Sequence, residues 1–213
     1  MLELNRIYNC DCLELIKELD DKSVDLILTD PPYALNSKYD LYNDTDDNLK
    51  ELINKVMPEF LRVGRAVLIT CGIKNITYYP QPYWILAWTY TTTNSTGKWG
   101  FTQWQPILAY GKDPYLVNRR GRQRDVINST GLGKRNFDHP CPKPLKFWTE
   151  LLLRGSVNEG DIILDPFIGS GTTAVACIRT GRQFIGMEIS EEYCKIAQKR
   201  IDDELSQLKL NLG

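Results

Sequence analysis

Residues 161–173 read DIILDPFIGSGTT, a short apolar run followed at once by proline and glycine. Such a run predicts a buried strand, and the glycines favour a tight turn into a helix that ends at Gly181. Residues 183–189 repeat the strand pattern, and Ser190 is a suitable N-cap for a long final helix. This part of the chain therefore predicts two strands, each followed by a helix, in a parallel arrangement.

The same alternation extends toward the N-terminus. Apolar runs predict buried strands at residues 24–29, 66–71, 83–90 and 104–110. Apolar residues at helical spacing predict helices at residues 11–19, 45–61 and 144–154. Segments 34–44 and 112–137 lack such a period and are expected to be loops. The whole pattern predicts one α/β domain over residues 1–213, with a mostly parallel, twisted sheet covered by helices on both faces.

Composition excludes several classes of protein. The 213 residues are 42% hydrophobic and 25% charged, as in a folded globular protein and unlike a disordered one. No apolar run approaches the roughly 18 residues of a membrane helix, and the N-terminus does not resemble a secretory signal. We therefore expect a cytoplasmic protein with no membrane partner. Six dispersed cysteines without a CxxC pair, and one histidine, lack the spacing of a zinc site, so we expect no metal.

Charge is unevenly distributed, although the net charge is only −1. Nine basic and three acidic residues lie between Lys112 and Lys146, so this segment carries +6 and the rest of the chain −7. A basic segment on an acidic body is typical of a protein that contacts a polyanion on one side, although a solvated loop can have the same composition. The candidate DNA-binding residues are Arg119, Arg120, Arg122, Arg124, Lys134 and Arg135.

Two motifs follow predicted strands, where ligands bind in open parallel sheets. In the first, Gly169 and Gly171 let the backbone approach a ligand, and the helix that begins there offers free N–H groups. No lysine follows the second glycine, so this is not a P-loop. Glu188 ends the next strand, 23 positions after Asp165, near the offset of about 20 at which an acidic residue binds a ribose. These features favour a nucleoside with a small carboxylate-bearing tail.

The second motif is Asp30-Pro31-Pro32-Tyr33. Two prolines fix the backbone and remove two N–H donors, so the carbonyls and the Asp30 carboxylate remain as acceptors. A rigid group of acceptors suits a substrate amino group, and Tyr33 offers a flat face to a base. A strand-terminating turn capped by aspartate is the structural alternative.

These motifs together resemble those of the β class of DNA amino-methyltransferases, which use S-adenosylmethionine. DPPY matches the catalytic motif of that class, DPFxGSGTT at residues 165–173 matches its cofactor motif, and HPxxKP matches residues 139–144. The order, with the catalytic motif first, is also that of the class. The resemblance implies a Rossmann-like methyltransferase fold with circularly permuted motifs, and a short, loop-rich, basic target-recognition insertion at residues 111–138.

The resemblance also assigns roles to residues. It implies catalytic roles for Asp30, Pro31, Pro32 and Tyr33. The cofactor-binding residues that it implies are Asp11, Cys12, His139, Lys143, Asp165, Phe167, Gly169, Ser170, Gly171, Thr172, Thr173 and Glu188. Two partners are open for Lys143, the carboxylate of the cofactor and a nearby acidic residue, and a surface role is the alternative to both. His139 is expected to shape the cofactor site rather than to act as a base.

The resulting expectation is a site-specific enzyme that moves a methyl group from S-adenosylmethionine to N6 of a flipped adenine in double-stranded DNA. Methylation of N4 of cytosine is the alternative, ranked second because relatives that act there more often carry serine at the position of Asp30. A third hypothesis is a nucleic-acid-binding subunit that holds the cofactor without using it, and RNA stays open as a substrate. The resemblance also allows a homodimer and a cognate restriction endonuclease as partners.

Overall fold

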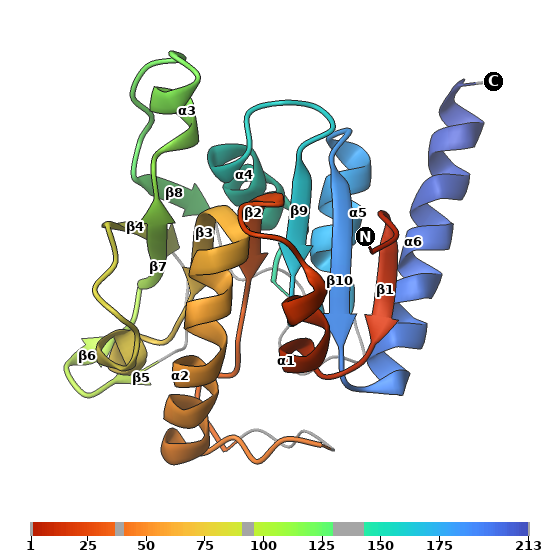
Figure 1. Ribbon diagram of the computed structural model, residues 1–213. Coiled ribbons are helices and arrows are strands. Elements are labelled where there is room, and N and C mark those ends of the chain that lie inside the picture. Colours follow the sequence, from red (N-terminus) through yellow and green to blue (C-terminus); the bar gives the residue numbers. More distant parts are fainter. Residues whose placement is uncertain (1, 37–40, 91–95, 130–142, 213) are drawn as a thin grey trace.

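The computed structural model describes residues 2–36, 41–90, 96–129 and 143–212. Its main feature is an eight-stranded sheet in the order β1-β10-β9-β2-β3-β7-β4-β8 (Figure 1). The strands are β1 (Arg6–Asn9), β2 (Val24–Thr29), β3 (Gly64–Thr70), β4 (Trp84–Tyr90), β7 (Trp104–Gly111), β8 (Val126–Ser129), β9 (Ile162–Asp165) and β10 (Gln183–Glu188). The short strands β5 (Thr96–Gly97) and β6 (Gly100–Phe101) form a separate hairpin.

The strand directions define a carboxyl end and an amino end of the sheet. β7 is antiparallel to both of its neighbours, β3 and β4, and the other strand pairs described in this eight-stranded sheet are parallel. The carboxyl ends of the parallel strands therefore lie together, and we call this the carboxyl end of the sheet. The opposite side is the amino end. β7 begins at the carboxyl end and finishes at the amino end, as its upward arrow in Figure 1 shows.

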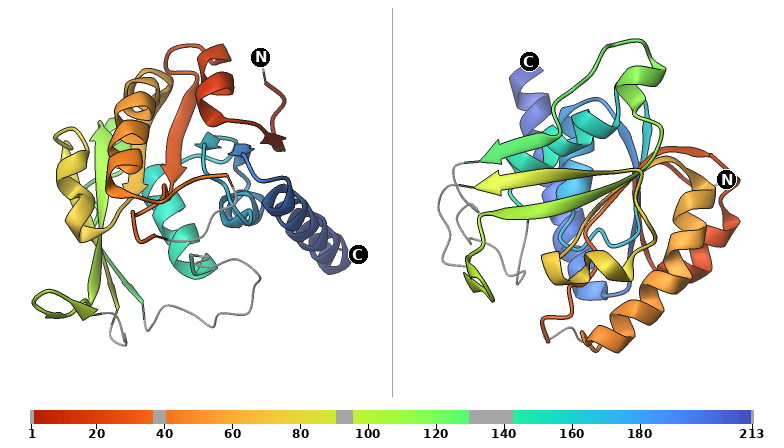
Figure 2. Two further views of the ribbon diagram at one scale, coloured as in Figure 1. Left: turned by 90° about the horizontal axis from the view of Figure 1, so that it is seen from below. Right: turned by 90° about the vertical axis from the view of Figure 1, so that its left-hand side faces the viewer.

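Helices cover both faces of the sheet. They are α1 (Cys12–Leu15), α2 (Asp46–Val63), α3 (Pro114–Val117), α4 (Leu145–Gly155), α5 (Thr172–Arg179) and α6 (Glu191–Leu212), with 3₁₀ turns η1 (Ile16–Glu18) and η2 (Ile73–Tyr78). α2 and η1 pack on one face, and α4, α5 and α6 on the other (Figure 2). The residues of β2 alternate accordingly, because Ile27 belongs to the core beneath α2 while Leu26 and Leu28 belong to the core beneath α4.

The predicted α/β fold with a mostly parallel sheet is confirmed, with local differences. The predicted helix at 11–19 is split into α1 and η1. The segment expected to be a loop at 112–137 contains α3 and β8, and the strand β1 was not predicted. Four strands were therefore missed: the two-residue strands β5 and β6 of the separate hairpin, and the four-residue strands β1 and β8 at the two borders of the sheet. Most of their side chains keep contact with solvent, so they lack the apolar run that identifies a buried strand. In the described part of the chain, no helix has the length and apolar character needed to cross a membrane.

The turn from β9 into α5 is fixed by a close contact with α6. Gly171 is the N-cap of α5 and has a φ of 82°, in the left-handed region that favours glycine. A Cβ atom added at Gly171 would lie 2.8 Å from the Cβ of Ala197 and 3.1 Å from its Cα, in the middle of α6. Two constraints therefore favour glycine at position 171: the left-handed backbone conformation, and the lack of space for a side chain beside Ala197.

Alanine substitutions at Gly171 and at a control glycine, Gly160, separate the backbone constraint from the packing constraint. Gly160 has a φ of 80°, and a Cβ added there would have no atom within 4 Å. We expect Gly160→Ala to lower the free energy of unfolding by about 1–2 kcal/mol, because alanine disfavours a left-handed backbone. Gly171→Ala should lower it by the same amount plus about 1–3 kcal/mol, because the added methyl group overpacks against α6. Urea unfolding of both variants measures the difference. An equal loss of unfolding free energy in the two variants would show that α6 moves away from residue 171 at no cost.

Candidate active site

The carboxylate of Asp30 lies at the carboxyl end of the sheet and receives three hydrogen bonds. Asp30 follows Thr29, the last residue of β2. The hydroxyl of Tyr33 donates to its Oδ1 at 2.5 Å, and the hydroxyl of Thr70, which ends the neighbouring strand β3, donates to the same oxygen. The Nζ of Lys143 donates to Oδ2 at 2.5 Å. The two side chains of this ion pair are 12% and 24% exposed for Lys143 and Asp30, so the carboxylate is partly shielded yet still reachable.

Tyr33 is fixed at both its ends. Its hydroxyl accepts a hydrogen bond from Nε2 of Gln105 in β7, and its backbone carbonyl accepts one from Nδ2 of Asn75 at 2.7 Å. The Nζ of Lys143 lies 4.9 Å from the centre of the ring. Burial raises the pKa of Tyr33 well above its ordinary value, and the adjacent Asp30 carboxylate raises it further. The phenol therefore stays protonated and donates to Asp30 throughout the neutral pH range.

Three residues of this network were not predicted. Thr70 had a usable signal, because it falls near the end of the predicted strand 66–71, beside the strand that leads to Asp30. Asn75 lies on η2, a 3₁₀ turn without a clear sequence pattern. Gln105 reaches the site only because β7 is antiparallel and starts at the carboxyl end of the sheet. That direction was not part of the sequence-based prediction.

Asp165 joins the DPPY motif to the glycine loop, which we define as residues 165–173. The hydroxyl of Thr29 donates to its Oδ1 at 2.7 Å, and the backbone N–H of Phe167 donates to the same oxygen at 3.1 Å. The hydroxyl of Thr173 donates to Oδ2 and itself accepts from Nε1 of Trp148 at 2.7 Å. Asp165 is 3% exposed, and burial raises its pKa to about 7. The carboxylate thus accepts hydrogen bonds from groups of the protein, and these bonds hold the glycine loop in place.

Glu188 closes β10 beside the glycine loop. Its Oε2 accepts the N–H of Gly169 at 3.0 Å, and its Oε1 accepts the N–H of Ser190 at 2.9 Å. Burial raises the pKa of Glu188, while these N–H groups act in the opposite direction. Asp11, the N-cap of α1, follows the adjacent strand β1, in which Asn9 pairs with Glu188. Two carboxylates thus lie at the carboxyl ends of the neighbouring strands β1 and β10, and that of Glu188 contacts the loop.

Other predicted cofactor residues differ in how they are placed. Ser170 is held by Arg200 of α6, whose Nη1 donates to its carbonyl oxygen at 2.5 Å and to its Oγ at 2.9 Å. Cys12 is 5% exposed, and burial raises its pKa to about 12, so its thiol acts as a core side chain. Thr172 is buried in the first turn of α5. His139, the remaining predicted residue, lies outside the described residues.

The four predicted DNA-binding arginines lie away from this site. β7 pairs with β3 so that Ile107 is opposite Thr70 and Gly111 opposite Ala66. The chain therefore enters the segment of Arg119, Arg120, Arg122 and Arg124 at the amino end of the sheet, where Figure 1 shows α3. Nη2 of Arg120 contacts Oδ1 of Asn158, ahead of β9, at 3.4 Å.

The structure therefore does not bring these four arginines to Asp30. Their position gives no support to the prediction that they contact DNA at the site of reaction. The other two predicted basic residues, Lys134 and Arg135, lie outside the described residues.

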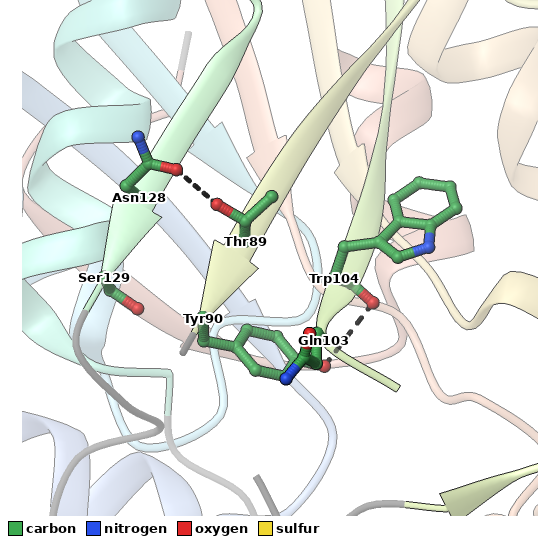
Figure 3. A pocket seen from close by; sticks show the side chains of 6 residues that line it. All are labelled: Thr89, Tyr90, Gln103, Trp104, Asn128 and Ser129. Atoms are coloured by element: carbon green, nitrogen blue, oxygen red, sulfur yellow. Dashed lines mark hydrogen bonds between the residues drawn. The ribbon is translucent and has the colours of Figure 1, made fainter. Parts of the chain in front are cut away.

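An open pocket lies at the carboxyl ends of β4 and β8 (Figure 3). Its volume is about 510 Å³, and its described lining is Thr89, Tyr90, Gln103, Trp104, Asn128 and Ser129. The Tyr90 hydroxyl donates to the backbone carbonyl of Trp104 at 3.4 Å, and the Thr89 hydroxyl donates to Oδ1 of Asn128. Trp104 precedes Gln105 in β7, so one lining residue is next in sequence to a member of the Tyr33 network.

Comparison with known proteins identifies the family. Residues 89–199 match the model of a family described as DNA methylase, labelled N6/N4. The type II methyltransferase M2.DpnII of Streptococcus pneumoniae is 52% identical, over 93% of this chain and 90% of that protein. The chain belongs to the N6/N4 DNA methylase family. The predicted family resemblance is thereby confirmed, and the chain is a DNA methyltransferase of this family.

Two further relatives of this methyltransferase are informative. The DNA adenine methyltransferase YhdJ of Escherichia coli K12 is 27% identical, over 97% of this chain and 88% of that protein. A crystal structure of the M1.HpyAVI–SAM complex has 26% sequence identity and a TM-score of 0.64, and the match covers 92% of this chain and 98% of that one. The agreement extends over nearly the whole chain, so the α/β architecture is that of known DNA methyltransferases.

The buried carboxylate of Asp165 predicts a pH dependence of stability in this methyltransferase. Its pKa is raised from 3.8 to about 7 in the folded state. Between these values the unfolded chain releases a proton that the folded chain keeps, so this group lowers the free energy of unfolding as the pH rises, with no further change above about 7. In Asp165→Asn this contribution is absent. Denaturant unfolding between pH 4.5 and 7.5 should therefore show the variant gaining stability relative to the wild type as the pH rises, and a constant difference would contradict the expectation.

Proposed function

We propose that this methyltransferase transfers the methyl group of S-adenosylmethionine to the exocyclic N6 of adenine in DNA. The observation that supports the proposal most directly is the Asp30 carboxylate, held by Tyr33, Thr70 and Lys143 at the carboxyl end of the sheet. The similarity to a DNA adenine methyltransferase over 97% of the chain favours adenine as the base.

The hydrogen bonds of Asp30 leave room for one substrate donor. An ionised carboxylate offers about four acceptor positions. Tyr33, Thr70 and Lys143 occupy three of them. One position then remains for an N–H of the substrate amino group, and the carbonyl of Pro31 is the acceptor we assign to its second N–H.

These two acceptors would activate a poor nucleophile. The lone pair of an exocyclic amino nitrogen is conjugated into the ring of the base and is not available for attack. Two acceptors that hold both N–H groups steer the nitrogen toward tetrahedral geometry and turn the lone pair toward the methyl donor. The nitrogen would gain the methyl group while the methyl–sulfur bond of the sulfonium breaks and leaves a neutral thioether. The nitrogen would then release one proton to solvent, and the Asp30 carboxylate would stabilise the positive charge that develops before this release.

The residues around the glycine loop fit S-adenosylmethionine. Each oxygen of Glu188 accepts one backbone N–H, so both retain acceptor capacity for the ribose hydroxyls. Asp11 lies on the adjacent strand connection and is the acceptor we assign to the adenine amino group of the cofactor. Gly169 has a φ of 51° and leaves the loop backbone accessible. The cofactor supplies an activated methyl group, and the protein supplies its position.

Tyr33 would hold the flipped base in place. Hydrogen bonds from Gln105 and to Asp30 fix its hydroxyl, so the plane of the ring is defined before the substrate arrives. Lys143 covers one face of this ring. We therefore assign the opposite face to the target base, which must leave the duplex to reach it.

The experiment that tests the function is methyl transfer from labelled S-adenosylmethionine to unmethylated duplex DNA, followed by mass analysis of the nucleosides. The expected product is N6-methyladenine. N4-methylcytosine would contradict the choice of base. A lack of any methylated nucleoside, with cofactor binding intact, would favour the non-catalytic hypothesis or an RNA substrate.

Removal of the Asp30 carboxylate tests the mechanism. In Asp30→Ala the substrate amino group loses one acceptor and the developing charge loses its counter-charge. We expect kcat to fall by roughly 10²–10³-fold, the magnitude typical for loss of one transition-state contact. Calorimetric titration with S-adenosylmethionine should give a dissociation constant close to that of the wild type. A variant that still turns over at a comparable rate would disprove the assigned role.

Lys143→Met distinguishes the two partners that the sequence left open. The ion pair with Asp30 predicts that kcat falls, by roughly 10²-fold if the carboxylate shifts by about 1 Å, while cofactor affinity is retained. Lys143→Arg is the matched control, because it keeps the charge and should recover part of the rate. A large loss of cofactor affinity in the methionine variant, with kcat unchanged, would instead assign Lys143 to the carboxylate of the cofactor.

A further inference from the structure

The β5–β6 hairpin presents two aromatic side chains to solvent. Thr96 pairs with Phe101 and Gly97 with Gly100, so Lys98 and Trp99 form the turn. Trp99 is 102% exposed and Phe101 is 73% exposed. Gly100 has a φ of 115°, which lets the chain turn back within two residues. A tryptophan held outward on so short a hairpin contributes no buried area to the described fold, which suggests that it contacts another molecule.

The hairpin lies at the same end of the sheet as Asp30. Figures 1 and 2 show β5 and β6 projecting beyond the carboxyl end, where β7 begins. Six residues after Trp99, the side chain of Gln105 donates to the hydroxyl of Tyr33. A short stretch of chain therefore links the hairpin to Gln105 and the hydrogen bonds around Asp30. The arginine segment, in contrast, lies at the amino end of the sheet.

We propose that the β5–β6 hairpin is a DNA-binding wedge, in which Trp99 stacks on a base next to the target adenine and stabilises the flipped-out state. This inference rests on the proposed function. Flipping a base removes its stacking partners and leaves a gap in the duplex. Apolar side chains that enter a base step compensate for such unstacking, and an aromatic ring can stack on any base regardless of its sequence.

Charge and shape favour DNA as the occupant. Lys98, at the turn, is the one charged residue in the sequence 96–103, so the tip has a charge that suits phosphates. Trp99 and Phe101 are two positions apart on the hairpin and both are exposed, so two rings are available to contact bases. The other exposed aromatic pair, Tyr83 and Trp84, lies at the amino end of β4, where Nε1 of Trp84 donates to Oδ2 of Asp125 at 3.1 Å.

The first test compares Trp99→Ala with Tyr83→Ala. Tyr83 is 76% exposed and serves as the matched control, because it is an exposed aromatic residue at the opposite end of the sheet. Fluorescence anisotropy with a labelled duplex should show affinity lower by about tenfold for Trp99→Ala, as expected when one base loses a stacking partner. Tyr83→Ala should bind as the wild type does, and both variants should keep their affinity for S-adenosylmethionine.

The second test asks whether Trp99 acts on base flipping. With 2-aminopurine in place of the target adenine, we expect a smaller fluorescence rise on binding for Trp99→Ala than for the wild type, and an intermediate value for Trp99→Phe. A duplex with an abasic position opposite the target is already unstacked there, and methyl transfer by Trp99→Ala should recover on it. An affinity loss without this recovery would assign the hairpin to a contact outside the base stack and overturn the wedge.

Two further outcomes would also overturn the proposal. Equal DNA affinity and equal flipping in Trp99→Ala and wild type would remove the hairpin from the DNA interface. A change of sedimentation coefficient in Trp99→Ala without DNA would assign it to a contact between copies of the chain. If the wild type makes no N6-methyladenine, the proposed function fails, yet the anisotropy comparison of the two alanine variants on duplex DNA still decides whether the hairpin binds DNA.

Discussion

The buried carboxylate of Asp165 connects the DPPY motif and the glycine loop of this methyltransferase. It accepts hydrogen bonds from Thr29, at the end of β2, and from Thr173, in the first turn of α5. Trp148 of α4 adds a further donor through Thr173. Because Asp30 follows Thr29 directly, this single group fixes the DPPY motif relative to the glycine loop. The arrangement requires a desolvated carboxylate, whose pKa is correspondingly raised.

The two aspartates illustrate how partners decide the role of a carboxylate. Asp165 is surrounded by hydroxyl and N–H donors and is closed to solvent. Asp30 has a cation on one oxygen and hydroxyl donors on the other, and it keeps contact with solvent. The first can therefore support structure without reaching a ligand, and the second can hold a fixed orientation while one acceptor position stays open.

The sequence allowed the central strands and both loops to be predicted, because parallel buried strands are continuous apolar runs and their loops have distinctive glycine and proline patterns. It also placed Asp30 and Glu188 at one end of the sheet. The direction of β7 was not predictable from apolar content, since an apolar strand has the same pattern in either direction. The positions of the arginines and of Gln105 depend on that direction, so both were missed.

The reversal of β7 has a consequence for how the loops of this fold can change. β4 ends and β7 begins at the carboxyl end of the sheet, the end that also holds Asp30, whereas the connection that follows β7 starts at the amino end. Added residues between β4 and β7 would change the end of the sheet that holds Asp30, and added residues at the start of the connection that follows β7 would leave that end unaltered. One inverted strand thus places consecutive connections at opposite ends of the sheet, so each can change in length without moving the other.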